Sequence, residues 1–309
     1  MNKIVFFNHY HRGDLHTSKE FVRQVIDNLP NVEFEYWSNN PNVLVSDLNL
    51  EITNSPDSLD KKDALVKQGD TMFVNTWVGC QWDIFCKHGG INMNTFYEQW
   101  ELLFKGINKF FDSNLKLRSE KESYLPRMDW NKLKIRNKNS IENFMATIDK
   151  KKVLICNNVP ASNQSYMYNE DSLIVKIAKD NPDVRFFTTD HVAQKDGVPS
   201  NLTDLTVVYS DLEDCDLREI SYMSTFCDVI IGKNSGRFVF SEIHQNYMDS
   251  NKKFVSFNTK NPEFDEIKET MSNGLDIKCS YTTVPIYTID KPTEKDVKAI
   301  DKAIRDAIQ

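Results

Sequence analysis

Residues 3–16 read Lys3-Ile4-Val5-Phe6-Phe7-Asn8, then His9-Tyr10-His11-Arg12-Gly13-Asp14-Leu15-His16. The first six residues form an apolar, β-branched and aromatic run, which predicts a buried strand. Thr17-Ser18-Lys19-Glu20 then matches a capping box, so we predict that a helix begins there. The connection between this strand and this helix is long for its type and rich in ionisable groups. Because ligands of open α/β sheets bind where strands lead into helices, the loop is a predicted functional site.

The same alternation of strand and helix signals continues along the chain, which predicts an α/β fold. In the first half we predict strands at 3–8, 32–37, 43–45 and 71–75, and an amphipathic helix at 93–111. In the second half we predict strands at 153–157, 184–188, 205–209, 228–232 and 254–258. The predicted helices of that half lie at about 139–149, 170–180, 215–226, 236–248 and 293–308.

A polar and basic stretch at about 116–151 separates the two series and suggests an inter-domain connection. We therefore predict two Rossmann-like domains that face a central cleft, where a ligand would bind. The predicted boundaries are an N-terminal domain at 1–135, a linker at 136–151, a C-terminal domain at 152–290 and a C-terminal helix at 291–309. No G-x-G-x-x-G or Walker A motif is present in the sequence, which weakens the dehydrogenase and P-loop interpretations.

Charge and composition narrow the class of protein. A net charge of −7 argues against a dedicated nucleic-acid-binding protein, which normally carries a strongly basic face. No apolar run in the sequence is long enough for a transmembrane helix, so any contact with a membrane is expected to be peripheral. The six cysteines are widely scattered and lack the spacing of a zinc site, which favours a reducing, cytoplasmic location.

A second motif lies late in the chain, where the strand predicted at 228–232 runs into Lys233-Asn234-Ser235-Gly236-Arg237. Ser235 is a natural N-cap, and Gly236 lets a ligand approach the backbone closely. Free N–H groups at a helix start, with Lys233 and Arg237 beside them, suit a diphosphate. The alternative is an ordinary capped helix with two solvated cations.

Together, Gly13-Asp14-Leu15-His16-Thr17 and Asn234-Ser235-Gly236 resemble motifs of the heptosyltransferase family and related sugar transferases of the GT-B fold. The resemblance implies an acceptor domain followed by a nucleotide-sugar domain, an inverting reaction without a metal, and Asp14 as the base. The family's late turn more often has Asp, then Thr or Ser, then Gly, with a His soon after. Here Asn234 opens the turn and Arg237 follows it, so the resemblance leaves the donor open.

Asp14 suits the role of general base, because a carboxylate within reach of an acceptor hydroxyl can take its proton. Alternatively, Asp14 is a turn residue that bonds its own backbone, or a metal ligand, although the histidine spacing gives no strong ligand pattern. We predict that His11, Arg12, Gly13 and His16 contact the acceptor; isolated histidines are more often structural or surface residues. Lys19, one turn into the predicted helix, is read as solvated.

Three further loops follow predicted strands and carry candidate contacts. The polar loop at 157–165 places Asn158 and Ser162 near the donor, although an ordinary surface loop has the same composition. Tyr209, which opens an acidic loop, is a candidate for gripping the nucleotide base or ribose. Trp77 is a candidate for stacking on the acceptor sugar, with core or lid packing as the alternative.

The sequence thus predicts a metal-independent glycosyltransferase that needs no cofactor. It would move a sugar from a nucleotide-diphosphate sugar to a hydroxyl of a glycan or glycolipid acceptor. Two alternatives remain open: a nucleotide-sugar epimerase or hydrolase on the same frame, and a non-catalytic protein that binds nucleotides or sugars.

Overall fold

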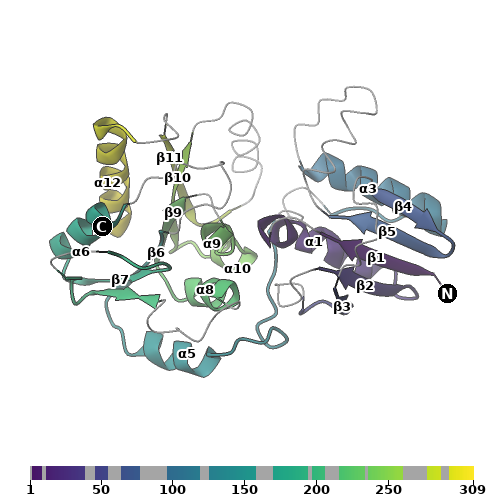
Figure 1. Ribbon diagram of the computed structural model, residues 1–309, viewed down its shortest axis with the longest axis horizontal. Coiled ribbons are helices and arrows are strands. Elements are labelled where there is room, and N and C mark those ends of the chain that lie inside the picture. Colours follow the sequence, from purple (N-terminus) through teal and green to yellow (C-terminus); the bar gives the residue numbers. More distant parts are fainter. Residues whose placement is uncertain are drawn as a thin grey trace. The chain divides into compact units, whose positions relative to one another are not determined.

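The structure is a computed structural model. It describes residues 2–8, 12–38, 46–54, 64–76, 96–118, 125–157, 170–193, 197–205, 216–233, 236–259, 277–286 and 292–309. The described residues up to Lys134 form one compact unit, and those from Ile135 onward form a second. Each unit is built around its own sheet (Figure 1).

The first unit holds a five-stranded sheet in the order β3-β2-β1-β5-β4. Its strands are β1 (Lys3–Phe7), β2 (Glu33–Trp37), β3 (Glu51–Thr53), β4 (Leu65–Gln68) and β5 (Thr71–Asn75). β1, β2, β3 and β5 pair in parallel, whereas β4 pairs antiparallel with β5 in a hairpin. Gly69 lies in that hairpin turn with φ +59°, a conformation that glycine adopts without strain.

Two helices of the first unit, α1 (Arg12–Asn28) and α3 (Phe96–Phe111), meet over one face of this sheet. The ring of Phe21 on α1 lies 6.5 Å from that of Phe6 on β1 and 5.4 Å from that of Phe104 on α3. Successive strand residues point to opposite faces, so Val5 and Phe7 form a second apolar cluster with Phe73 on the other side.

The second unit holds a six-stranded parallel sheet in the order β11-β10-β9-β6-β7-β8. Its strands are β6 (Lys151–Cys156), β7 (Val184–Thr188), β8 (Leu202–Asp204), β9 (Val229–Lys233), β10 (Lys253–Thr259) and β11 (Ser280–Ile286). Counted from β6, the spatial order is that of the dinucleotide-binding Rossmann fold.

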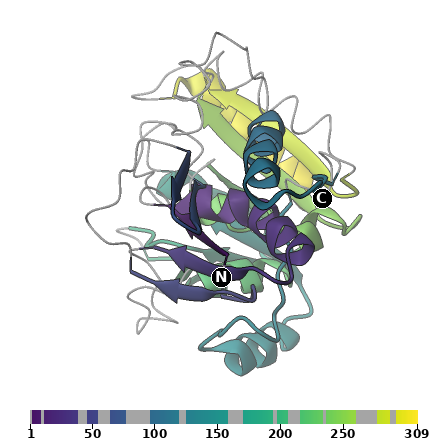
Figure 2. The same cartoon turned by 90° about the vertical axis from the view of Figure 1, so that its right-hand side faces the viewer.

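The helices of the second unit are α5 (Lys138–Ala146), α6 (Asp171–Asp180), α8 (Asp216–Ser224), α9 (Gly236–Val239), α10 (His244–Tyr247) and α12 (Glu294–Ile308). α6 and α12 bury Ile177, Ile300 and Ile304 in one apolar core with the strands. α8, α9 and α10 lie on the other face (Figure 1). Figure 2 shows the same helices and strands after a quarter turn. The predicted α/β class with two Rossmann-like units is confirmed.

Two helix predictions were wrong in detail. α1 begins at Arg12, five residues before the predicted capping box. Thr17 and Ser18 therefore lie inside the helix, where their hydroxyls donate to the carbonyls of Gly13 and Leu15 instead of capping its start. The single helix predicted at 236–248 is two short ones. Phe238 and Phe240 are both fully buried, and an α-helix would turn them about 200° apart.

The strand predicted at 205–209 is wrong at its first residue. β8 occupies Leu202–Asp204, and Leu205 already lies beyond its end. The rest of that predicted strand, at 206–209, lies outside the described residues, as does the strand predicted at 43–45.

Gly232 in β9 sits where the sheet packs most closely on α9. A Cβ added there would lie 2.8 Å from Cys156 Cβ and 3.0 Å from both the Cys156 carbonyl oxygen and Phe238 Cδ2. We expect Gly232→Ala to lower the free energy of unfolding by about 1–3 kcal/mol, because a backbone atom cannot yield to the new methyl group. Gly236→Ala is the control, since its Cβ would meet nothing within 4 Å in the part of the chain that the structure describes. Equal urea midpoints for the two variants would contradict this packing.

Candidate active site

The carboxyl ends of β6 and β9 mark the point where the strand order of the second sheet reverses. In open α/β sheets the ligand crevice lies outside such a switch point. The residues that follow β6, β7, β8 and β9 in the chain therefore define the candidate site, and the neighbouring strand ends bring them to one edge.

The ends of β6 and β7 are tied together by one side chain. The Asn157 amide donates to the Asp190 carbonyl at 3.2 Å, and its oxygen accepts from the Asp190 N–H at 2.8 Å. Thr188 and Thr189, directly before Asp190, are 0% and 2% exposed, and their hydroxyls have no hydrogen-bond partner among the described residues. Buried hydroxyls of this kind normally meet water or a ligand.

Arg237, in the first turn of α9, reaches across to the end of β7. Its guanidinium donates to the Thr189 carbonyl and lies 3.4 Å from the Asp190 carboxylate. The Arg237 side chain is 22% exposed and that of Asp190 is 45% exposed. Arg237 is thus accessible to a ligand at this edge, and its charge is already paired with the Asp190 carboxylate.

Lys233, at the end of β9, is buried instead. Its ammonium lies 3.1 Å from the carboxylate of Glu170, the residue before α6, and the two side chains are 1% and 6% exposed. The adjoining cavity measures about 10 Å³, room for roughly one water molecule. The ion pair between Lys233 and Glu170 therefore links the end of β9 to the start of α6 beside the switch point.

A histidine lies beside these groups. His191 Nδ1 is 2.8 Å from the Asp204 carboxylate at the end of β8, and the imidazole is 69% exposed. Asp190, His191, Asp204 and Glu170 were not among the predicted site residues. Asp190 and His191 come two and three residues after the strand predicted at 184–188, so the rule that placed the other candidates at strand ends would have found these two as well.

In the first unit, polar groups lie at the carboxyl edge of its own sheet. Asn8 follows β1, and Asn75 ends β5; they are 5% and 0% exposed. Thr76 donates its N–H to the Phe7 carbonyl at 2.9 Å, and its hydroxyl lies 2.6 Å from the Tyr36 hydroxyl. Since α1 begins at Arg12, Gly13 and Asp14 lie in its first turn at this edge.

The predicted acceptor contacts in α1 differ in accessibility. His16 is 1% exposed, whereas a Cβ added at Gly13 would meet nothing within 4 Å among the described residues. Seven predicted site residues lie outside the described residues: His11, Trp77, Asn158, Ser162, Tyr209, Asn234 and Ser235. Their roles, and those of Arg12, Asp14, Lys233, Gly236 and Arg237, stay predictions.

Lys19 is not solvated, contrary to the sequence interpretation. Its side chain is fully buried, and its ammonium lies 2.8 Å from the equally buried Asp47 carboxylate. Burial lowers the pKa of Lys19 to about 8, against the opposing pull of Asp47. Asp47 also accepts the Asp129 N–H at 3.0 Å, and Arg23 donates to the Arg127 carbonyl at 2.8 Å. This buried network holds the segment at 125–129 against α1.

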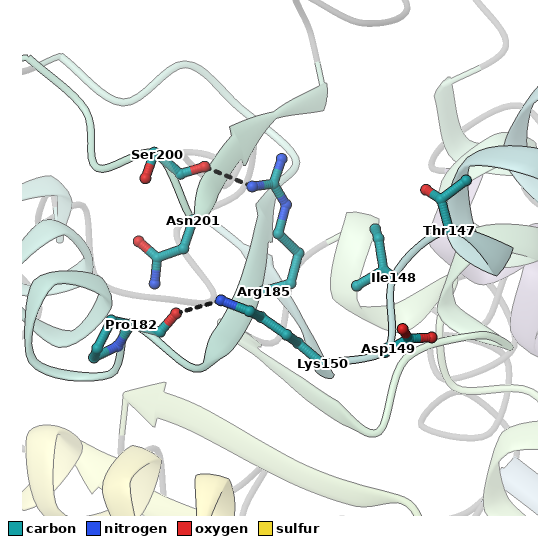
Figure 3. Close-up of a pocket in the computed structure, with 8 residues that line it drawn as sticks. All are labelled: Thr147, Ile148, Asp149, Lys150, Pro182, Arg185, Ser200 and Asn201. Carbon is teal, nitrogen blue, oxygen red and sulfur yellow. Dashed lines mark hydrogen bonds between the residues drawn. The ribbon is translucent and has the colours of Figure 1, made fainter.

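A larger pocket of about 490 Å³ lies at the opposite, amino edge of the second sheet. Lys150 and Arg185 line it, but Lys150 donates to the Pro182 carbonyl at 2.9 Å and Arg185 to the Ser200 carbonyl at 2.5 Å (Figure 3). Since ligands of parallel sheets bind at the carboxyl edge, this pocket is not our candidate site.

Within the part of the chain that the structure describes, no three His, Cys, Asp or Glu side chains gather as metal ligands would. Among the same residues, no helix combines the length and the apolar character needed to span a bilayer.

The comparisons with known proteins agree with this architecture. No protein-family model and no curated protein sequence matches the chain. Among solved structures, the family 9 glycosyl transferase from Veillonella parvula aligns with a TM-score of 0.59 at 10% identity, over 99% of this chain and 97% of that one. E. coli heptosyltransferase WaaC with ADP aligns with a TM-score of 0.52 at 6% identity, over 99% of both chains. E. coli ADP-heptose LPS heptosyltransferase II aligns with a TM-score of 0.50 at 10% identity, over 100% of this chain and 98% of that one. The chain therefore has the GT-B fold of the heptosyltransferases and family 9 glycosyltransferases.

Proposed function

We propose that the chain is a glycosyltransferase that moves a sugar from a nucleotide-diphosphate sugar to a hydroxyl of a glycan or glycolipid acceptor. The observation that carries the proposal is the switch-point edge of the second sheet. There Gly236 offers open space to a ligand, and Arg237 is a partly exposed cation. The fold shared with sugar transferases supports the same conclusion.

In the proposed reaction, the acceptor oxygen attacks the anomeric carbon from the side opposite the diphosphate, so the configuration inverts. The bond from that carbon to the diphosphate oxygen breaks, and the acceptor proton passes to Asp14. Asp14 lies in the first turn of α1, a position that suits acidic residues because free N–H groups there carry partial positive charge.

Charge develops on the departing diphosphate, and Arg237 with the backbone N–H groups of residues 234–236 would stabilise it. Fixed donors aimed at developing charge are usually the largest catalytic contribution. We propose that these groups suffice without a metal. Asn158, Ser162 and Tyr209 would complete the donor site, with Lys233 holding the turn through Glu170. His11, Arg12, Gly13 and Trp77 would contact the acceptor, whereas His16 is buried.

We also propose a cytoplasmic site of action with at most peripheral membrane contact. Cys156, Cys227 and Cys279 are free and buried, and burial raises the pKa of each thiol to about 12. Such thiols stay protonated and inert, as suits cysteines that serve only as small apolar side chains.

A thermal-shift panel of nucleoside diphosphates and their sugars tests the donor site. A ligand at a hundred times its Kd should stabilise the protein by about 2.7 kcal/mol, roughly 5–10 °C for a unit of this size. The shift should disappear in Arg237→Ala and persist in Arg305→Ala, whose guanidinium pairs with Asp180 at 2.7 Å far from this edge. No response across the panel, or an unchanged response in Arg237→Ala, would contradict the proposed donor site.

Turnover separates the alternatives. A transferase releases nucleoside diphosphate in proportion to an added acceptor, whereas an epimerase converts the nucleotide sugar with no acceptor present. A protein that only binds would show the thermal shift without either product.

A further inference from the structure

Arg237 is held by a backbone carbonyl and pairs with the carboxylate of Asp190. The Thr189 carbonyl accepts from its guanidinium, and the Asp190 carboxylate lies 3.4 Å away on a side chain that is 45% exposed. Ion pairs this exposed are weak, so a better anion can displace Asp190 at little cost.

Asp190 itself does not depend on that ion pair for its position. Its main-chain N–H and carbonyl bond to Asn157, and its Oδ1 accepts the His191 N–H at 2.9 Å. An asparagine at this position can keep all three hydrogen bonds. Charge can therefore be removed from Asp190 without moving the loop.

Lys233 ends β9, and Arg237 follows it in α9. Lys233 is buried against Glu170, whereas the Arg237 side chain is 22% exposed. Of these two cations, Arg237 is the one that a diphosphate at the switch point can reach, and its charge is paired with Asp190. A diphosphate offers Arg237 more charge and paired oxygens, which makes it the stronger partner.

We propose that the Asp190 carboxylate competes with the donor diphosphate for Arg237. The diphosphate displaces Asp190 from Arg237 when the donor binds, and Asp190 pairs with Arg237 again as the nucleoside diphosphate leaves. The inference rests on the proposed function, since it assigns a regulatory role at the same donor site. Product release limits the turnover rate of many well-evolved enzymes, and an Asp190 carboxylate that pairs with Arg237 again would speed that release.

The test is titration calorimetry with the nucleoside diphosphate that gives the largest thermal shift, on the full chain. Asp190→Asn should bind it about tenfold more tightly, and the shorter, uncharged Asp190→Ser should change affinity in the same direction. A tenfold gain is not what a merely damaged loop would give. The control is Asp180→Asn, which removes an equally exposed partner from Arg305 and should leave the affinity unchanged.

Each outcome of the calorimetry supports or contradicts the inference. If the wild type binds but Asp190→Asn binds no tighter, the inference is wrong and the donor site stands. If Asp180→Asn tightens binding as much, the effect is one of overall charge and the inference is again wrong. If no nucleoside diphosphate binds to either protein, the proposed function fails together with the inference.

Discussion

Asp14→Asn is expected to slow sugar transfer by about a hundredfold or more while leaving the Kd for the nucleoside diphosphate nearly unchanged. A positioned general base contributes about 10²–10⁴-fold to the rate, and an asparagine cannot accept the acceptor's proton. Asp14 lies in the first turn of α1, whereas the donor groups belong to the second unit. Kinetics and calorimetry on the same preparation separate the two effects.

Asp27→Asn is the matched control for this prediction. Asp27 lies on the same helix, its side chain is half exposed, and its contact with Arg118 is 3.4 Å long. We expect normal turnover from this variant. A slow Asp27→Asn enzyme, or an Asp14→Asn enzyme with normal kcat, would show that Asp14 is not the base.

The second large effect concerns stability. Asp47→Asn should lower the free energy of unfolding by about 3–5 kcal/mol, because it leaves the buried Lys19 ammonium without its carboxylate. Urea unfolding measures this loss. Replacing both partners by apolar residues, Lys19→Met with Asp47→Leu, should restore most of it, since neither charge then remains in the core.

The free energy of unfolding that Asp47→Asn loses should decrease as the pH rises from about 6 to about 8. The folded-state pKa of Lys19 is about 8, below its ordinary value, so the ammonium is charged in both the folded and unfolded states below that pH. Without Asp47 the folded-state pKa falls further, and Asp47→Asn regains stability as the pH rises toward 8. The deficit should thus be larger at about pH 6 than at about pH 8.

Above pH 8, the unfolded wild-type chain holds a proton on Lys19 that the folded chain has lost, so the contribution of Lys19 to stability rises with pH. A deficit in Asp47→Asn that is the same at both pH values, or no larger than that of Asp27→Asn, would contradict a buried charged pair.

The strands that decide the architecture could be predicted because they are buried on both faces. β1, β6 and β9 contain continuous apolar runs at 4–7, 153–156 and 229–231, which are typical of parallel strands inside α/β proteins. β3, β4 and β11 were not anticipated. They lie at the sheet margins with partly exposed residues, so their sequences lack a continuous apolar run.

The helix errors share a different cause. The capping-box pattern at 17–20 is a local signal for a helix start. Residues 12–16 are helical as well, so α1 begins closer to β1 than that pattern predicts. Thr17 shows the ambiguity, because its hydroxyl can cap a new helix or bond the carbonyl four residues earlier, as it does here with Gly13.

The candidate site was predictable only in part. Strand-end reasoning placed Gly13 and Asp14 after β1 and Arg237 after β9. It could not show that Arg237 meets Asp190, or that Lys19 meets Asp47, because no local pattern records a pairing between residues so far apart in the chain. The burial of Lys233 was hidden for the same reason, since its partner Glu170 belongs to another loop.

A crystal structure with the bound nucleoside diphosphate tests the donor site most directly. We expect a diphosphate oxygen within about 2.7–3.2 Å of the Arg237 guanidinium, at the carboxyl ends of β6 and β9. A nucleotide seated instead between Lys150 and Arg185, at the amino edge of the same sheet, would contradict the account.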